Sequence, residues 1–325
     1  MKKEIIFLAP DYYGFNEVVY GGFQKFSGGN VQKIVINESY RYKNLLEKIE
    51  NFFSKLFLNR NLKSIKAQKK LTQKFENLAF ADVIIINRHD LLTTEQLLIL
   101  HEKTSNLSCI LWDSLKKIPE QQKNLNIFTK VFSFDPHDCD EKGFVKIENF
   151  YFVKKMPPSA PKYKVSYLGT YDNRIITLLE FFKFFNQNHI SAIATLYIPK
   201  SGLGKIKMVL PKNIKFFHRI IPFRESPQMY DECEMILDLV HENQLGMSFR
   251  PFEALGLHKK LITNNPEVLK YDFYHPDNIF YVDTSADIVI PESFLESNYQ
   301  ILDEKIYEKY FIKNWVTKIV TEDEA

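Results

Sequence analysis

The chain has 325 residues, a length that suits two domains better than a single core. Its hydrophobic content of 45% and charged content of 26% are typical of a soluble globular protein. The net charge of +3 is too small to indicate nucleic-acid binding, so we expect no nucleic-acid partner.

The chain opens with a buried strand rather than a targeting segment. The apolar run 5–9 is shorter than the roughly 7–15 residues of a signal-peptide core, and Pro10 and Asp11 end it. No apolar run approaches the ~18 residues of a membrane span. Three isolated cysteines outside any C-x-x-C pair exclude a zinc-ligand pattern and suit a reducing compartment. We expect a cytoplasmic protein.

The first half alternates strand and helix signals. Continuous apolar runs without strict alternation predict a parallel sheet covered on both faces. The expected strands are 5–9, 31–36, 81–86, 107–112, 130–134 and 145–147, with helices over 42–78 and 94–103.

The long helical stretch is strongly basic. Ten Lys or Arg lie between Arg41 and Lys74, against Glu47 and Glu50, and five Phe or Leu residues lie among them at 52–58. One interpretation is a basic helix whose apolar face rests on anionic lipid, as a peripheral contact at the inner face of the cytoplasmic membrane. The other is a solvated helix whose Phe and Leu pack inward. The sequence leaves both open.

A proline-rich segment, 156–161, interrupts the pattern and predicts a stiff linker. After it the strand–helix alternation begins again. The expected strands are 164–169, 192–198, 214–217, 234–240, 260–263 and 279–282, with helices over 173–186, from Ser248, and over 303–320.

Two Rossmann-like halves therefore follow one another in the chain. We expect an α/β architecture in which the halves face each other across a ligand cleft at their strand carboxyl ends. The predicted domains are 1–155, an acceptor domain, and 162–302, a donor domain. The helix 303–325 is expected to cross back to the first domain.

The segment 236–264 is the most informative for chemistry. It is predicted to be a strand, a polar loop with Gly246, a helix capped by Ser248, and another strand. A glycine lets backbone approach a ligand, and the N–H groups at a helix start attract phosphate. Arg250 lies in the first helical turn, where the helix dipole disfavours a cation, which points to a bound anion. Glu253 lies on the same helical face, and its carboxylate suits the hydroxyls of a ribose. The alternative is a surface Arg250–Glu253 pair.

This segment resembles the nucleotide-sugar site of GT-B glycosyltransferases, closest to the group that makes lipopolysaccharide or capsular polysaccharide. The resemblance extends over most of the chain. It rests on Asp238, His241, Gln244, Gly246, Ser248, Arg250, Glu253, Gly256, Lys259, Lys260, Thr263 and Asn264, then on 271–278, and upstream on 167–170 with Arg174, on 112–114 and on 132–135.

The resemblance implies a GT-B fold and a donor site in the second domain. Glu253 would contact the ribose, and five residues would surround the phosphates: Gly169, Thr170, Arg174, Ser248 and Arg250. His241, Gln244, Gly246 and Lys259 are further candidates for binding the nucleotide sugar. One departure leaves the stereochemistry open, because the first glutamate of the E-x7-E pattern of retaining enzymes falls at Leu245.

The acceptor is expected on the first domain. Asp11, His89 and Asp113 each follow a predicted strand and are candidates for the catalytic base, with Asp90 orienting His89. Helix capping and turn formation are the alternative roles for these residues.

Glycosyl transfer needs a base and positive charge for the departing phosphate, which the arginines and Lys259 can supply. We therefore expect no metal and no cofactor beyond the nucleotide-sugar donor. The acceptor is expected to be a surface glycan or glycolipid. The alternatives are a catalytically inactive partner in a glycan assembly complex and a sugar-nucleotide epimerase of the same fold.

Overall fold

The computed structural model describes residues 2–155, 160–206, 208–241 and 246–321. The chain forms two compact units, Met1–Tyr12 with Val19–Ser133, and Tyr13–Val18 with Phe134–Ala325. The predicted linker lies mostly outside the described residues. The domain boundaries at 155 and 162, and the return of 303–325 to the first domain, therefore stay predictions.

The first sheet has six strands in the order β2-β1-β3-β4-β5-β6. Strands β1 to β5 pair in parallel, as the continuous apolar runs predicted. Their bounds are β1 (Glu4–Ala9), β2 (Asn30–Val35), β3 (Val83–Asn87), β4 (Leu107–Leu111), β5 (Lys130–Ser133) and β6 (Val145–Lys146).

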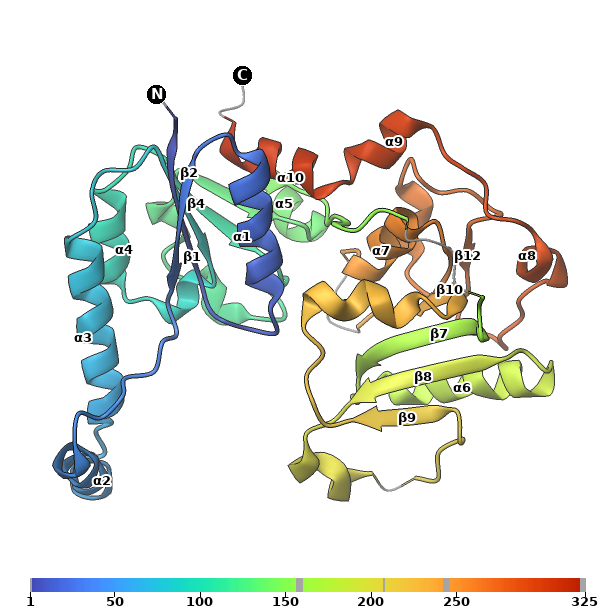
Figure 1. The fold of residues 1–325 in the computed structure, drawn as a ribbon, viewed down its shortest axis with the longest axis horizontal. Coiled ribbons are helices and arrows are strands. Elements are labelled where there is room, and N and C mark those ends of the chain that lie inside the picture. Colours follow the sequence, from blue (N-terminus) through green and yellow to red (C-terminus); the bar gives the residue numbers. More distant parts are fainter. Residues whose placement is uncertain (1, 156–159, 207, 242–245, 322–325) are drawn as a thin grey trace. The chain divides into compact units, whose positions relative to one another are not determined.

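Helices cover both faces of this sheet. In Figure 1, α3 and α4 lie on one side of the strands and α1 on the other, where the Phe23 ring packs 5.3 Å from that of Phe7. The helices of this half of the chain are α1 (Phe15–Phe26), α2 (Leu45–Leu58), α3 (Leu62–Glu76), α4 (Thr94–His101) and α5 (Pro136–Lys142), of which α2 lies beyond the end of α3 and away from the strands (Figure 1). The sequence pattern did not predict α1.

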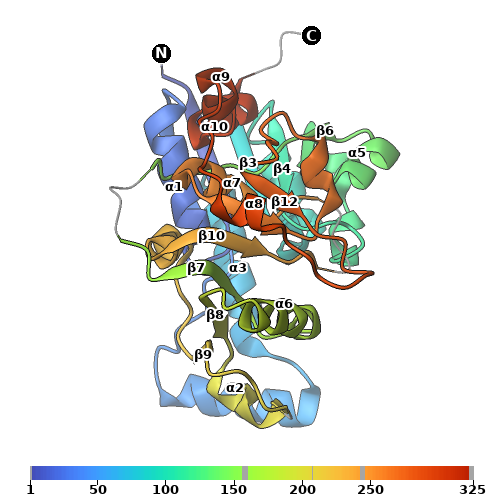
Figure 2. The ribbon, with the colours of Figure 1, turned by 90° about the vertical axis from the view of Figure 1, so that its right-hand side faces the viewer.

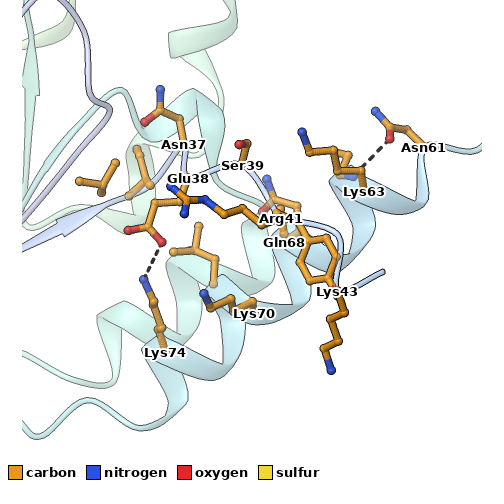
Figure 3. A pocket seen from close by; sticks show the side chains of 16 residues that line it. Asn37, Glu38, Ser39, Arg41, Lys43, Asn61, Lys63, Gln68, Lys70 and Lys74 are labelled. Carbon is orange, nitrogen blue, oxygen red and sulfur yellow. Dashed lines mark hydrogen bonds and ion pairs between the residues drawn. The ribbon is translucent and has the colours of Figure 1, made fainter. Parts of the chain in front are cut away.

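The single helix expected over 42–78 is in fact two helices. Asn59 ends α2 in the left-handed conformation with φ 50°, and the Asn61 side chain caps α3 by accepting a hydrogen bond from the Ser64 N–H. Asparagine tolerates that conformation and also caps helices, so two asparagines placed close together break the helix. Figure 3 shows α3 beside the loop that follows β2.

The second sheet has six strands in the order β12-β11-β10-β7-β8-β9, and all the pairs are parallel. The strands are β7 (Tyr163–Thr170), β8 (Ala192–Tyr197), β9 (Ile214–Phe217), β10 (Cys233–Asp238), β11 (Lys260–Thr263) and β12 (Ile279–Tyr281).

Five helices belong to the described part of this second half. They are α6 (Ile175–Gln187), α7 (Phe249–Leu257), α8 (Glu292–Glu296), α9 (Glu304–Lys309) and α10 (Ile312–Val320). Helix α7 starts after Ser248, as predicted. The stretch expected to be helical over 303–320 is divided where Tyr151 exchanges backbone hydrogen bonds with Tyr310 and Ile312.

Short 3-10 turns connect these elements. They are η1 (His89–Leu91), η2 (Pro119–Gln122), η3 (Leu125–Ile127), η4 (Lys200–Lys205), η5 (Phe223–Tyr230) and η6 (Pro266–Lys270). No described helix is long and apolar enough to cross a bilayer.

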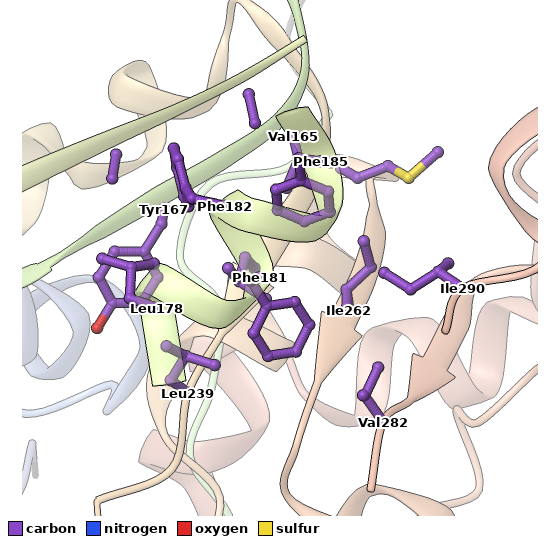
Figure 4. Close-up of a cluster of buried hydrophobic side chains, with 14 of the residues drawn as sticks. Val165, Tyr167, Leu178, Phe181, Phe182, Phe185, Leu239, Ile262, Val282 and Ile290 are labelled. Carbon is purple, nitrogen blue, oxygen red and sulfur yellow. The ribbon is translucent and has the colours of Figure 1, made fainter. Parts of the chain in front are cut away.

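The core of the second sheet lies on both of its faces. Helix α6 packs on one face beside β8 (Figure 2), with Leu178, Phe181, Phe182 and Phe185 buried at helical spacing. Figure 4 shows these rings against side chains from β7 and β11. Alternate strand residues face α7 on the other side, where Phe252 is fully buried.

The packing of α6 can be tested with two truncations in the same helix. Phe181→Ala removes a fully buried ring and should destabilise the second unit by about 3–5 kcal/mol, measured by chemical denaturation. Ile176→Ala, at an exposed position of α6, is the control and should cost less than about 0.5 kcal/mol. Equal effects of the two substitutions would contradict this packing.

Candidate functional site

The strand order of the second sheet reverses between β7 and β10, which pair in the middle of the sheet. The chain runs from β7 through β8 to β9 on one side, and from β10 through β11 to β12 on the other. In open α/β sheets, ligands bind outside the carboxyl ends of the strands at such a reversal. A ligand site is therefore expected at the ends of β7 and β10.

Asp238, the last residue of β10, accepts three hydrogen bonds. The Ser248 hydroxyl and Arg250 Nη1 donate to Oδ1 at 2.8 and 3.2 Å, and the Thr263 hydroxyl donates to Oδ2 at 3.1 Å. Asp238 is 1% exposed, so this buried charge depends on these donors. The carboxylate thereby ties the start of α7 to the ends of β10 and β11.

Arg250 reaches from the first turn of α7 to the end of β7. Its Nε and Nη2 both donate to the Leu168 carbonyl oxygen, at 2.9 and 2.5 Å, and its guanidinium lies 5.5 Å from the centre of the Tyr167 ring. With the bond to Asp238, the described partners use three of the five N–H donors of the guanidinium. Two donors remain for a ligand, on a side chain that is 17% exposed.

Arg174, just before α6, is held in a similar way. Its Nε and Nη2 donate to the two oxygens of Asp172 at 2.9 and 2.6 Å, and Nη1 donates to the Leu239 carbonyl oxygen at 3.3 Å. Burial acts to raise the pKa of Asp172, but the hydrogen bonds and charge of Arg174 outweigh burial, and the pKa is lowered. Arg174 is also 17% exposed.

Arg174 and Arg250 bond to the carbonyl oxygens of Leu239 and Leu168, near the ends of the neighbouring strands β10 and β7, and the charge of Arg250 acts to lower the pKa of Arg174. Each guanidinium is fixed by a carboxylate and a strand-end carbonyl, so neither can turn away without losing those bonds. An anion placed between them would relieve the repulsion and use the remaining N–H donors. The arrangement is thus suited to a phosphate or diphosphate group.

Glu253 contacts a different element. Its carboxylate accepts a hydrogen bond from the Ser226 hydroxyl of η5, and the residue is 5% exposed. Burial raises the pKa of Glu253, and the hydrogen bond from Ser226 and the charge of Arg250 only partly offset this. The alternative of a surface Arg250–Glu253 pair is therefore not what the structure shows. The bond from Ser226 uses one oxygen of the carboxylate, and a carboxylate can accept further hydrogen bonds from ribose hydroxyls.

Packing within the protein accounts for both glycines of the expected site. A Cβ on Gly169 would lie 2.7 Å from the Tyr167 hydroxyl, and one on Gly246 would lie 2.5 Å from the Phe134 ring. A side chain at either position would require its neighbour to shift, whether or not a ligand binds. Close approach of these glycines to a phosphate stays a prediction.

Only some of the other residues predicted to bind the donor lie near Arg174 and Arg250. Thr170 is exposed at the end of β7, and His241 lies near enough to Asp172 to interact with its charge. Gln244 lies outside the described residues. Lys259 is not at this edge, because its Nζ donates to the carbonyl oxygen of Cys233, at the opposite end of β10.

In the first unit, the strand order reverses between β1 and β3. Asp11 follows β1 and is exposed, and its N–H donates to Asn37 Oδ1 at 2.8 Å. Asp113 follows β4 and pairs with Lys117 Nζ at 2.6 Å. Both residues are thus at the expected edge of this sheet.

His89 is a core residue in the structure rather than a base oriented by Asp90. It is buried, its Nδ1 lies 3.2 Å from Cys109 Sγ, and its Nε2 lies 3.1 Å from the Lys123 carbonyl oxygen. Burial lowers the pKa of His89. Asp90 instead accepts two hydrogen bonds from Arg88, at 2.8 and 2.7 Å.

Arg88 is a residue that the sequence reasoning missed. It has the left-handed conformation with φ 64°, and its guanidinium lies 6.0 Å from the centre of the Tyr12 ring. An arginine with this conformation is uncommon, and nothing in the sequence marks it. Ser226 was missed as well, because it lies 27 positions before its partner Glu253, in a segment without a recognisable pattern.

No group of three or more His, Cys, Asp or Glu side chains in the described ranges is placed to hold a metal ion. No protein-family model matches the chain, and no curated protein sequence matches it.

Solved structures do match over nearly the whole chain. An alpha-glucosyltransferase in complex with UDP and a DNA 13-mer superposes with a TM-score of 0.58 at 9% identity, covering 98% of this chain and 95% of that chain. The lipopolysaccharide outer core galactosyltransferase WaaB gives a TM-score of 0.50 at 13% identity, with 98% and 99% covered. The fold is the GT-B fold. MnaA of S. aureus with UDP also matches, with a TM-score of 0.50 at 10% identity and 100% and 99% covered. The two parallel sheets of the structure and these fold matches confirm the Rossmann-like halves that the sequence predicted.

The burial of Glu253 predicts a pH-dependent effect of Glu253→Gln. Because the pKa is raised in the folded state, the folded protein retains a proton above the ordinary glutamate pKa of about 4.3, where the unfolded chain releases it. The contribution of this group to stability therefore falls as pH rises from there through the raised folded-state pKa. The melting temperature of E253Q relative to wild type should increase from about pH 4 to about pH 7.

Glu180→Gln provides the control, since it removes an exposed carboxylate on α6. A melting-temperature difference for E253Q that falls with pH would mean that the carboxylate is stabilised as an anion, contrary to its surroundings.

Proposed function

We propose that this protein is a glycosyltransferase that moves a sugar from a nucleotide-sugar donor to a hydroxyl group of an acceptor. The observation that carries the proposal is the pair of anchored guanidinium groups, Arg174 and Arg250, at the strand reversal of the second sheet. The GT-B fold, which alpha-glucosyltransferase and galactosyltransferase structures share, supports it.

In the proposed reaction, the bond between the sugar and the diphosphate breaks, and negative charge grows on the departing phosphate. Arg174 and Arg250 would stabilise that charge with their remaining N–H donors. Because carboxylates and strand-end carbonyls already hold both guanidinium groups, little reorganisation is needed as the charge develops. The Thr170 hydroxyl, at the end of β7, would be a further donor to the phosphates, whereas the single O–H of Ser248 already donates to Asp238.

For the remaining parts of the donor we propose that Glu253 accepts a hydrogen bond from the ribose. His241, Gln244 and the backbone near Gly246 are proposed to lie beside the nucleotide sugar. Lys259 has no part in donor binding, because its Nζ bonds at the other end of β10.

On the acceptor side we propose that Asp11 or Asp113 takes the proton of the attacking hydroxyl. His89 is left out because it is buried against Cys109 and the Lys123 carbonyl. The acceptor is proposed to be a lipopolysaccharide, capsule or other surface glycan, as the sequence resemblance implies and the likeness to WaaB supports. A glycolipid acceptor would place the enzyme at the inner face of the cytoplasmic membrane. The absence of a nucleic-acid acceptor stays a prediction.

Donor binding can be measured with a thermal-shift panel of UDP-, GDP-, CMP- and dTDP-sugars. The true donor should stabilise the protein by roughly 2–3 kcal/mol at ~100 times its dissociation constant. Arg174→Gln should weaken binding of the matching nucleoside diphosphate about 10- to 100-fold, because a charged hydrogen-bond donor is lost. Binding of the nucleoside alone should change little.

The matched control is Lys162→Gln. It removes one positive charge at the amino end of the same sheet, where Lys162 pairs with Glu232. Equal losses in the two variants would indicate a general charge effect and count against the site. A flat response of the wild type to the whole panel would favour an inactive partner protein. Conversion of the free sugar nucleotide without an acceptor would favour an epimerase.

The proposed step uses arginine side chains rather than a metal ion for the departing phosphate. The rate of sugar transfer should therefore stay unchanged after treatment with EDTA. A rate that falls with EDTA and returns with Mg²⁺ or Mn²⁺ would contradict metal independence. The thermal-shift panel tests the donor site separately.

A further inference from the structure

Helix α2 presents its large apolar side chains to solvent. Phe52, Leu56 and Phe57 are 62%, 64% and 72% exposed, and Leu46 and Phe53 are exposed on the same side of the helix. The Phe53 and Phe57 rings stack with 5.9 Å between their centroids. A contiguous exposed apolar face of this kind marks a surface that interacts with an apolar partner. The expectation that these residues pack inward is therefore wrong.

Polar contacts on the opposite side hold α2 in this orientation. The buried residues of α2 are Asn51 and Ser54. Asn51 donates to the Tyr42 hydroxyl at 2.7 Å and accepts from the Lys63 N–H at 3.1 Å, and Ser54 donates to the Arg60 carbonyl oxygen at 3.0 Å. Rotating the helix to bury its phenylalanines would break both bonds of Asn51, which join α2 to Tyr42 and Lys63. The apolar face is thus fixed outward.

A basic hollow lies between the loop after β2 and α3, and α2 contacts its lining where Asn51 accepts from the Lys63 N–H. It has a volume of about 910 Å³. Five cationic side chains line it, Arg41, Lys43, Lys63, Lys70 and Lys74, and Glu38 is the one carboxylate among the lining residues (Figure 3). Glu38 pairs with Lys74 at 3.0 Å. The remaining positive charge attracts phosphate groups.

We propose that α2 and the basic hollow together form a docking surface for a bilayer that contains anionic phospholipids. The phenylalanines and leucines of α2 enter the boundary between headgroups and acyl chains. Lipid phosphates meet the lysines of the hollow, and Lys48 and Lys55, both exposed on α2, add further positive charge. The helix lies along the surface, because its apolar residues form one face rather than a span.

Charge complementarity selects a bilayer over a second copy of this chain. Two copies that paired through the same α2 face would bring two sets of uncompensated lysines together, and these would repel. An anionic membrane offers both acyl chains for the apolar side chains of α2 and negatively charged headgroups for the lysines of the hollow. The inference does not rest on the proposed reaction, because it needs neither nucleotide nor acceptor.

Vesicle sedimentation with the full-length protein tests the proposal. Wild type should bind vesicles containing phosphatidylglycerol about tenfold more tightly than vesicles of phosphatidylcholine, and salt should weaken that binding. A variant with Phe52→Ser and Phe57→Ser should lose about tenfold or more in affinity for the anionic vesicles. Lys70→Glu should weaken binding to anionic vesicles and leave the weak binding to neutral vesicles unchanged.

The matched control replaces two exposed apolar residues elsewhere, Leu98→Ser on α4 and Ile176→Ser on α6. It should bind vesicles like the wild type. Equal binding of the control and the Phe52/Phe57 variant, or no binding of wild type to anionic vesicles, would overturn the proposal. Wild-type self-association that the phenylalanine substitutions abolish would instead make this face an interface between copies.

If the double variant folds poorly, membrane insertion of α2 can be measured in a second way. Phe57→Trp preserves an aromatic side chain at the most exposed ring of α2. Its fluorescence emission, after subtraction of the two native tryptophans, should shift to the blue on addition of anionic vesicles. An unshifted emission would contradict insertion. Nucleotide binding measured without vesicles reports separately on the proposed function.

Discussion

The carboxylate of Asp238 is the contact on which the candidate site depends. It lies buried at the end of the central strand β10 and is bonded to Ser248, Arg250 and Thr263. Through these bonds it fixes the start of α7, the end of β11 and the direction in which Arg250 crosses to β7. A buried charge of this kind is costly unless its donors stay in place, so the same interaction that orients the site also makes that orientation rigid. Arg174 repeats the principle with Asp172.

The sequence predicted the parts of the molecule that local pattern controls. Apolar runs placed the strands of both sheets within one or two residues, and Ser248 marked the start of α7 because an N-cap serine is a short-range signal. It could not predict which polar groups meet across the fold. His89 is polar in sequence yet buried against Cys109, and Glu253 bonds to Ser226 from a distant turn. Those pairings depend on tertiary packing rather than on spacing.

The sequence pattern also could not show which side of helix α2 is buried. The phenylalanines and leucines of α2 lie along one face, a pattern typical of a helix that buries its apolar side. In the structure, however, Asn51 and Ser54 are the buried residues and the apolar face is exposed. The choice is made by polar partners in residues 42, 60 and 63, which periodicity alone does not reveal. An enzyme that modifies a glycolipid would benefit from such a surface, because a membrane-bound acceptor is met in two dimensions rather than three.

The central claim is that Arg174 and Arg250 together receive the phosphates of a nucleotide. The most direct measurement is a crystal structure of the protein with the nucleoside diphosphate that binds most tightly. Phosphate oxygens within hydrogen-bond distance of both guanidinium groups, at the ends of β7 and β10, are the predicted result. A nucleotide bound elsewhere, with both arginines still bonded only to Asp172, Asp238 and the two strand-end carbonyls, would contradict the account.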